Sequence, residues 1–441
     1  MPIARSGAGR VGHSQRFPLS IHPSGRYLVD ASGRPFLLHG DVCWAIAGQL
    51  TDAQVDQYLN NRAAKGFTSI LVSAPEYYFT SQTPTYNNVD GIAPFATMSP
   101  VDWASSFTAY WDRVDRIING AKARGMACIV NPAYLGYPNG PEGWQVEIAA
   151  ESDADLQTYG ARLANRYTQG NIIWCLGGDN DPVAAGSSSL FTKQWNIVTG
   201  IRSVRTSDII TAHPLADSNA DDAYTYWSSG YAGFNLNMIY GWETASPAHY
   251  VYDLASQAYA RSMPFIGFEF MYEAVPENSP DRARLRRQSY GALLSGACGQ
   301  LFGNDPLWYF NSPHGDASSQ SWVDAMDDVG SSQQVYVKQL FAAFEWWKLV
   351  PKTDASLVSS SLSSGTTRLY PALASDGTFA LIYVPSSQTV TVVMSVFAAS
   401  SVRVRLYDPT TGTYSSVGTY ANTGSQNIAT GGERVIVVDA P

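Results

Sequence analysis

The sequence has few cysteines and no metal-binding motif. Its four cysteines, Cys43, Cys128, Cys175 and Cys298, show no CxxC spacing, and its six histidines include no HExxH pair. Each cysteine falls in or beside a segment that we predict to be a buried strand, which favours buried free thiols. We therefore expect no metal site and no cofactor.

Long apolar runs are also missing. No run approaches the roughly 20 residues that a membrane-spanning helix needs, so we expect no membrane association. The N-terminal segment MPIARSGAGRVGHSQRF is basic but lacks the apolar core of a secretory signal. As the sequence stands, this predicts a cytoplasmic protein, and a secreted or periplasmic location stays open if a signal was removed.

The chain has no concentration of positive charge. Its formal net charge is −9, its isoelectric point is about 5.1, and no basic run is longer than the pair Arg286-Arg287. Nucleic-acid-binding proteins carry a basic patch or stripe, so we expect no nucleic-acid partner. The arginines between Arg282 and Arg287 either lie beside an anionic substrate or form a solvated helix face, and the second arrangement is the more common one.

Aromatic residues, by contrast, are abundant. The 441 residues include 12 Trp and 26 Tyr, and only 15% of them are charged, which indicates a compact globular protein. This length exceeds what one hydrophobic core usually holds. We predict a flexible leader over residues 1–19, a large domain over 20–350 and a smaller one over 351–441.

In the large domain, short apolar segments alternate with amphipathic helical patterns. For example, Thr51-Asp52-Ala53-Gln54 reads as a capping box that starts a helix, Gly66 ends it, and a buried strand follows. The predicted strands are 36–41, 67–73, 126–131, 171–177, 208–213, 234–240, 264–269 and 298–303. Eight strands alternating with helices favour a (β/α)8 barrel over an open doubly wound sheet. The open sheet also lacks support from motifs, because GxGxxG does not follow the first strand and GxxxxGK[ST] is absent.

The two ends of the chain do not show this alternation of strands and helices. Residues 25–30 and 34–40 read as a hairpin around Ala31-Ser32-Gly33 that caps the barrel floor. From about Pro351, Ser- and Thr-rich segments alternate with short strands, which predicts a small antiparallel β-sandwich. We expect the helix through Phe341, Phe344, Trp346 and Trp347 to dock the two domains.

Polar residues follow the predicted barrel strands. The loops at the C-terminal ends of barrel strands form a single mouth, so these residues are candidates for contacts with a ligand. In chain order they are His39, Asp41, Glu76, Asn131, Tyr134, Asp179, Asp181, His213, Tyr240, Trp242, Glu269 and Asn304. Trp44, Trp144 and Trp308 lie nearby or in long loops and are candidate platforms for a sugar ring, although core packing is at least as common.

Two of the carboxylates suit the hydrolysis of a glycoside. That reaction needs one carboxyl group to protonate the departing oxygen and a second to attack the sugar or to activate water. Gly177-Gly178 allows a tight turn that points Asp179 into the mouth. Glu269 ends a buried apolar strand, where an ionised carboxylate is unfavourable unless it has a partner or a function. We therefore expect a carbohydrate substrate.

Structural alternatives exist for several candidates. Asp181 precedes a proline and suits a helix cap, and Glu76 suits a salt bridge within a loop. For His39 and Asp41, a place in the core is about as common as a contact with ligand.

Longer stretches resemble a known family. GRYLVDASGRPFLLHGDVCW, ILVSAPE, NPAYLGY, NIIWCLGGDND, GFEFMYE, LLSGACGQLFGN and RLYDPTTG are similar to the apiosidase-like glycoside hydrolases of family 140. In that family, a barrel domain formerly of unknown function is joined to a C-terminal domain called "putative collagen-binding". The resemblance extends from about Ser20 to the C-terminus.

The resemblance implies a retaining exo-glycosidase that releases a terminal pentofuranosyl sugar, with β-D-apiose as the defining sugar. It implies Asp179 as acid/base and Glu269 as nucleophile. The wider clan usually has a Glu after Asn as acid/base, whereas this chain has Gly178-Asp179-Asn180, so Asp181 stays an alternative. Another furanosidase such as an arabinofuranosidase, or a non-catalytic carbohydrate-binding protein, remains open. For the C-terminal domain we expect a supporting role, because its sequence shows no collagen-reading groove.

Overall fold

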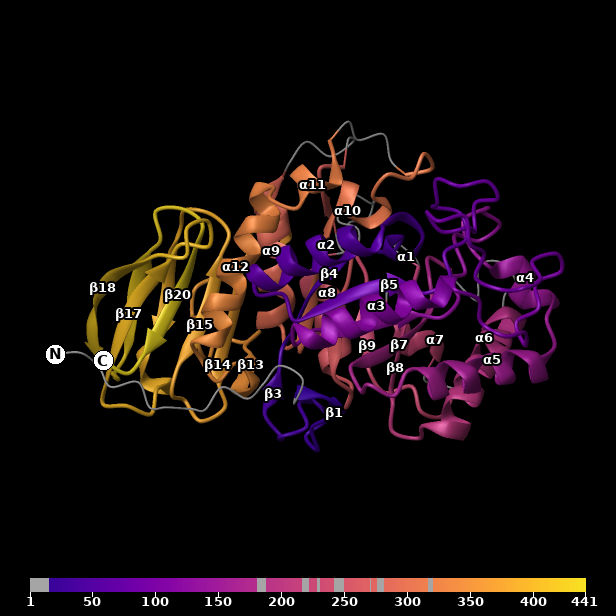
Figure 1. Cartoon of the computed structure of the whole chain (residues 1–441). Helices are drawn as coiled ribbons and strands as arrows, with labels where there is room; N and C mark the ends of the chain where they lie inside the picture. The colour runs from indigo at the N-terminus through magenta and orange to yellow at the C-terminus, as the bar shows by residue number, and fades with distance from the viewer. Residues whose placement is uncertain are drawn as a thin grey trace.

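The computed structural model describes most of the chain. The described residues are 16–180, 188–215, 222–227, 231–241, 250–269, 271–275, 281–315 and 320–441. They form a barrel with a smaller sheet domain at its side, which lies on the left of Figure 1. Across these ranges, no helix combines the length and the apolar character that crossing a membrane requires.

Eight parallel strands build the barrel, as predicted. Their hydrogen-bonded order is β8-β7-β6-β5-β4-β12-β10-β9. The strands are β4 (Leu38–Val42), β5 (Ser69–Ser73), β6 (Ala127–Asn131), β7 (Ile172–Gly177), β8 (Ile209–His213), β9 (Asn237–Ile239), β10 (Phe265–Gly267) and β12 (Gly299–Asn304). Between β8 and β9 the ring closes through the backbone N–H groups of Asn235 and Leu236, which both donate to Ile210. The (β/α)8 prediction is therefore confirmed.

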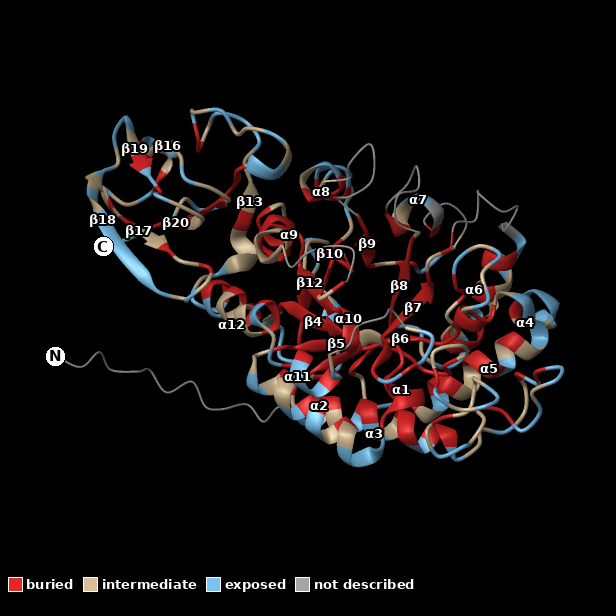
Figure 2. Ribbon diagram, turned by 90° about the horizontal axis from the view of Figure 1, so that it is seen from above, coloured by how far each residue is buried: buried red, intermediate tan, exposed pale blue. Residues whose placement is uncertain are grey.

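Helices surround these strands and bury their apolar faces on them. Figure 2 shows the strands buried and the outward faces of the surrounding helices exposed. The longer helices are α2 (Asp52–Ala64), α3 (Tyr110–Ala123), α5 (Asp153–Arg166), α6 (Ser188–Val204), α8 (Val251–Tyr259), α9 (Arg282–Leu294) and α12 (Val329–Ala342). Short helices are α1 (Ile46–Gln49), α4 (Gln145–Ala150), α7 (Ala223–Trp227), α10 (Asp305–Tyr309) and α11 (Trp322–Ala325). The predicted capping box is present, since Thr51 and Gln54 exchange hydrogen bonds at the start of α2.

The predicted hairpin around Ala31-Ser32-Gly33 is present, but its strands are shorter than predicted and a third strand pairs with it. The N-terminal segment forms three short antiparallel strands, β1 (Ser20–Ile21), β2 (Leu28–Val29) and β3 (Pro35–Phe36). The chain then leaves this small sheet, because the side chain of Leu37 is buried in the cluster between the two domains and Leu38 begins the barrel. The residues predicted as one long strand thus serve two sheets.

The C-terminal domain has two sheets that face each other. The larger has the order β13-β14-β15-β20-β17-β18, and β16 pairs with β19. Apolar side chains of both sheets share one core, including Val390 and Ile428 from the small sheet and Ile382 and Val404 from the large one. The strands are β13 (Leu349–Pro351), β14 (Tyr370–Ala374), β15 (Ala380–Val384), β16 (Thr389–Val393), β17 (Ser401–Tyr407), β18 (Tyr414–Ala421), β19 (Ser425–Ala429) and β20 (Arg434–Asp439).

The two domains are joined by a buried interface. Tyr290 of α9 and Phe341 of α12 pack with Tyr383 and Val437 of the large sheet. The predicted docking helix ends at Ala342, and Phe344 and Trp346 reach the same cluster from the segment that follows, whereas Trp347 does not belong to it. Arg286 of α9 also donates two hydrogen bonds to Glu433 of the sheet domain. The sheet domain is therefore packed on the barrel and is not a freely tethered module.

Candidate active site

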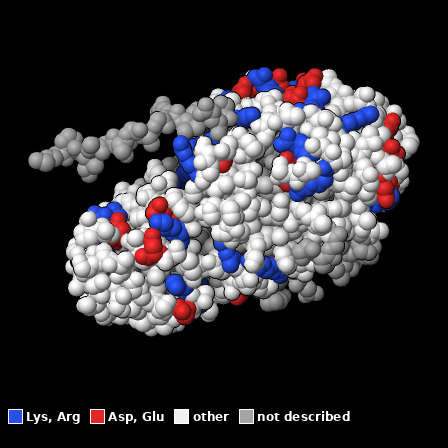
Figure 3. Space-filling model, turned by 90° about the horizontal axis from the view of Figure 1, so that it is seen from below, with Lys and Arg blue, Asp and Glu red and all other residues white. Residues whose placement is uncertain are grey.

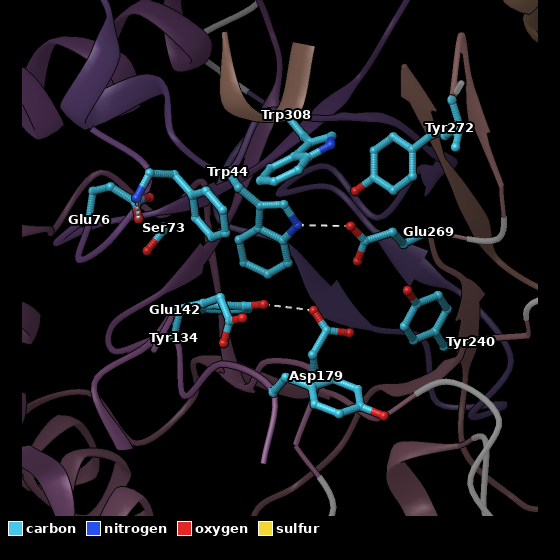
Figure 4. A pocket seen from close by; sticks show the side chains of 13 residues that line it. Trp44, Ser73, Glu76, Tyr134, Glu142, Asp179, Tyr240, Glu269, Tyr272 and Trp308 are labelled. Atoms are coloured by element: carbon cyan, nitrogen blue, oxygen red, sulfur yellow. Dashed lines mark hydrogen bonds between the residues drawn. The ribbon is translucent and has the colours of Figure 1, made fainter. Parts of the chain in front are cut away.

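A pocket opens at the C-terminal ends of the barrel strands. Its volume is about 350 Å³, within the usual range for small-ligand sites. Figure 4 shows side chains from several loops pointing into it. The lining residues are Trp44, Ser73, Glu76, Phe79, Tyr134, Tyr137, Glu142, Asp179, Tyr240, Glu269, Tyr272, Val275 and Trp308.

Asp179 and Glu269 both have a strained backbone in this pocket. Their φ angles are 45° and 43°, in the left-handed region that residues with a side chain rarely adopt. Such strain costs of order 1–3 kcal/mol and is concentrated at functional sites. The two carboxylates that the sequence singles out are therefore both held in conformations that the surrounding structure has to impose.

The glycine pair before Asp179 makes room for its neighbours. A Cβ atom on Gly177 would lie 2.3 Å from the carbonyl oxygen of His213, and one on Gly178 would lie 2.3 Å from the ring of Tyr134. Both glycines also have positive φ angles. With no side chain at position 178, the Tyr134 ring lies against the backbone and its hydroxyl donates a 2.7 Å hydrogen bond to Asp179.

His213 connects the two carboxylates. Its Nε2 lies 2.6 Å from one oxygen of Glu269 and 3.9 Å from one oxygen of Asp179. Its Nδ1 lies 2.6 Å from the carbonyl oxygen of Pro214 and 3.2 Å from the backbone nitrogen of Asp179. The imidazole is fully buried, so it supports the carboxylates from behind the pocket.

Glu269 has a second partner on its other oxygen. The indole Nε1 of Trp44 donates a 2.9 Å hydrogen bond to it, drawn as a dashed line in Figure 4. Trp44 itself packs against the rings of Tyr134 and His213. Each oxygen of Glu269 therefore has a hydrogen-bond partner, which fixes the orientation of the carboxyl group.

The electrostatics of this pair follow from burial. Desolvation raises the pKa of Glu269, and the hydrogen bond and charge of His213 lower it only in part. Burial by itself would lower the pKa of His213, but the charges of Asp179 and Glu269 raise it above its ordinary value. The pair thus retains a proton to a higher pH than an isolated glutamate would.

Asp179 is the more accessible of the two carboxylates. Its side chain is 25% exposed, against 6% for Glu269. Burial, followed by the charge of Asp179, raises the pKa of Tyr134, so its hydroxyl remains a donor at neutral pH. The site therefore combines a shielded carboxyl group with one that faces the opening.

Glu76 is a third carboxyl group in the pocket wall. Its Oε1 accepts hydrogen bonds from the backbone N–H groups of Tyr77 and Phe79. Burial raises its pKa to about 7, although these bonds lower it. The structure shows a hydrogen-bonded loop carboxylate here, and among the residues that the structure describes it has no salt-bridge partner.

Other predicted site residues also reach the pocket. Tyr240 and Trp308 line it, and Tyr240 packs edge-on against His213. Asp181 and Trp242 lie outside the described residues.

His39 and Asp41 do not reach the pocket, because both point from β4 toward the helix layer. His39 stacks on Phe67 and contacts Gln300, and burial lowers its pKa to about 3. Asp41 pairs with Arg62 of α2. Side chains alternate along a strand, so two residues that are two positions apart share one face. We expected His39 and Asp41 to contact a ligand, but the structure places both in the core of the barrel domain.

Asn131, Trp144 and Asn304 are also fully buried outside the pocket. Asn131 donates to the carbonyl of Gly177 and so supports the turn before Asp179. Trp144 lies in an aromatic cluster with Trp103 and does not provide a platform for sugar. Asn304 donates to Asp328.

Sequence reasoning missed several lining residues. Tyr272 lies on the two-residue strand β11 (Tyr272–Glu273), which pairs in parallel with β12 and is too short to give a periodic signal. Glu142, Phe79 and Tyr137 reach the pocket from long loops. The hydroxyl of Tyr272 is buried without a hydrogen-bond partner among the described residues. Trp44, a candidate platform from the sequence, does line the pocket, just after β4.

Two family models together match almost the whole chain. A model described as "Apiosidase-like, catalytic domain" matches residues 22–348. A second, described as "Putative collagen-binding domain of a collagenase", matches residues 350–438. Among curated protein sequences, none matches this chain.

Solved structures of glycoside hydrolases share the fold. A structure titled simply "Glycoside hydrolase" superposes with a TM-score of 0.80 at 20% identity, covering 96% of this chain and 97% of that one. A family 5 glycoside hydrolase from Bacteroides vulgatus gives the same TM-score and identity, covering 96% and 93%. An endo-1,4-β-mannanase from Rhizomucor miehei gives a TM-score of 0.52 at 12% identity, covering 74% and 99%. At these identities the likeness concerns the fold.

Proposed function

Because this chain belongs to the apiosidase-like family of glycoside hydrolases, we propose that it is a retaining exo-glycosidase for a terminal pentofuranosyl sugar. The proposed sugar is β-D-apiose, carried by plant-derived glycosides or pectic side chains. The observation that carries the proposal is the contact of His213 with both Asp179 and Glu269. It places two carboxyl groups at one end of a pocket lined with aromatic rings.

The spacing of the carboxyl groups supports retention. Since one imidazole nitrogen lies 2.6 Å from Glu269 and 3.9 Å from Asp179, the two oxygens are at most about 6.5 Å apart, the sum of these distances. Retaining enzymes hold their carboxyl groups about 5–5.5 Å apart, and inverting enzymes about 6.5–9.5 Å, because a water molecule must fit between. The largest separation of the two oxygens that His213 allows is therefore about equal to the smallest separation found in inverting enzymes, and any shorter separation favours retention.

The proposed reaction has two steps. First, a Glu269 oxygen attacks the anomeric carbon while Asp179 gives its proton to the glycosidic oxygen, so the bond to the aglycone breaks and a glycosyl ester forms. Then Asp179 takes a proton from water, the water oxygen attacks the same carbon, and Glu269 is released. The shielded position of Glu269 suits the nucleophile, and the exposed position of Asp179 suits a group that meets the leaving oxygen and water.

The test is sugar release from a panel of apiosyl, arabinofuranosyl and pyranosyl glycosides. We expect release of a single sugar from the apiosyl glycoside. NMR should show that the sugar released first has the same anomeric configuration as in the substrate. Release from the arabinofuranoside alone would replace apiose by another furanose, and initial release of the opposite anomer would refute retention. Saturable glycan binding without any product would favour a non-catalytic binding protein.

Replacement of Asp179 by Asn is expected to lower kcat/KM by roughly 10²–10⁴-fold, because the leaving oxygen then departs without a proton. The loss should be largest for alkyl aglycones, which leave poorly, and smaller for aryl aglycones. The matched control is Asp181→Asn, which should retain activity if residue 181 only caps or turns the chain. The reverse pattern in the two variants would assign the acid/base role to Asp181.

His213 is a positioning residue, and its replacement by Asn is expected to alter the pH profile. Glu269 must be ionised to attack, so its raised pKa places the acid limb of kcat/KM above the ordinary glutamate pKa of about 4.3. Loss of His213 removes a group that lowers this pKa, so the acid limb should move to still higher pH. An unmoved acid limb would refute this coupling. His314→Asn, at an exposed position outside the pocket, is the control.

A further inference from the structure

Two pockets adjoin each other along the junction of the barrel and the sheet domain. One, of about 470 Å³, lies between α8, the end of α9 and residues 351–353 and 368–371. The other, of about 340 Å³, lies between the N-terminal sheet and residues 346–350. Tyr259 lines both, so we treat them as one feature and call it the seam groove.

The seam groove is distant from the active-site pocket in the fold. It lies beside β1–β3 and β13, at the bottom of Figure 1, whereas α10, which follows the C-terminal end of β12, lies near the top. None of the described residues lines both the seam groove and the active-site pocket. A ligand in the groove would therefore leave the proposed catalytic residues untouched.

Aromatic rings line the groove on both sides of Tyr259. Tyr27, Trp346 and Trp347 lie on one side, and Tyr252 lies on the other. All of these rings are partly exposed. Partly exposed rings in a concave surface are suited to packing against the apolar C–H faces of sugar rings.

Two arginines in the groove have uncompensated charges. Arg26 lies over the Tyr259 ring and donates to the carbonyls of Tyr259 and Arg261. Arg368 lies over the Tyr252 ring and donates to the carbonyl of Ser363, while its Nε is buried without a partner. Among the described residues, neither guanidinium has a carboxylate within salt-bridge distance, although the protein as a whole carries a net charge of −9.

The other charged groups near the seam groove change its positive charge little. Lys352 adds a positive charge and lies near Asp354, and Lys348 is paired with Glu345 and Asp376. Asp253 is the acidic residue among those that line the groove. Figure 3, which views the molecule from below, shows basic side chains near the junction of the two lobes.

We propose that the seam groove is a second carbohydrate-binding site, selective for a glycan that bears carboxylate groups. The rings supply stacking surfaces for sugars, and the two guanidinium groups supply the planar donors that pair with carboxylates. The groove would hold an acidic polysaccharide on the enzyme while side chains of that polymer are cleaved elsewhere. This binding does not depend on the proposed catalytic function and can be measured without turnover.

The test is calorimetric titration of the whole protein with a galacturonate hexamer at low salt. The wild type should bind the hexamer at least ten-fold more tightly than its fully methyl-esterified form, which lacks the charges. Binding should also weaken at high salt, because the arginines are partly exposed. Equal binding of the two forms, no binding of either, or binding of a collagen peptide alone would overturn the proposal.

Variants assign the binding to the groove. The double variant Arg26→Gln/Arg368→Gln, and separately Trp347→Ala on the other wall, should each weaken binding of the hexamer at least ten-fold. Arg403→Gln, an arginine of the sheet domain that is paired with Asp439, is the matched control. Unchanged affinity in both groove variants would overturn the assignment. Release of sugar from a small aryl glycoside should be unchanged in all of them.

Discussion

Glutamine in place of Glu269 is expected to lower kcat by about 10⁴-fold or more, because removal of a nucleophile forfeits the covalent step. The substitution keeps the size of the side chain and an oxygen that accepts from Trp44, so the fold should be unchanged. Initial rates on the glycoside that the wild type cleaves best, together with the melting temperature, measure both effects. Full activity in a folded variant would remove Glu269 from the mechanism.

A control variant at a second glutamate distinguishes the loss of the Glu269 carboxylate from a general effect of removing one negative charge. Glu147 lies on α4, contacts the hydroxyl of Tyr77 and does not line the pocket. Glu147→Gln should therefore retain wild-type turnover. If both variants were equally impaired, the effect would be one of overall charge or stability, and the covalent role of Glu269 would lose its support.

The barrel could be predicted from the sequence because each repeat carries strong local signals. A capped amphipathic helix, a terminating glycine and a short buried strand recur, and the structure contains a parallel strand at each of the eight predicted places. Asp179 could be singled out for a similar reason. Gly177-Gly178 directly before a carboxylate indicates a forced turn, and the structure shows positive φ angles at all three residues.

The direction of the side chains could not be predicted, because it depends on strand alternation and on packing between distant elements. His39 and Asp41 were expected at the end of a strand, where catalytic residues lie, but both lie within β4 on the face that is directed toward α2 and α12. The role of Asp41 becomes clear only from its partners on α2, Tyr58 and Arg62, which lie 17 and 21 residues later in the chain. Similarly, Tyr272 reaches the pocket from the two-residue strand β11, which pairs with β12, and Glu142 reaches it from a loop. Both placements depend on tertiary contacts.

Arg62→Leu is expected to lower the free energy of unfolding by about 3–5 kcal/mol, because it leaves the carboxylate of Asp41 buried without a positive partner. Both side chains are fully buried, and Arg62 also donates to Ser331 and to the carbonyl of Met326. Burial raises the pKa of Asp41 although Arg62 and Tyr58 lower it, which indicates that the cost of desolvation is not fully offset. Urea unfolding of wild type and variant gives the difference.

The double variant Asp41→Asn/Arg62→Met tests whether the loss of stability comes from the unpaired buried charge. It removes both ions and keeps a hydrophobic side chain of similar length, so it should recover a large part of the lost stability. If Arg62 acted only through its hydrogen bonds to Ser331 and Met326, the double variant would be no more stable than Arg62→Leu. Neither residue lines the pocket, so KM should be unchanged in the double variant at temperatures where it is folded. A raised KM would instead return Asp41 to the ligand-binding role that its place at a strand end first suggested.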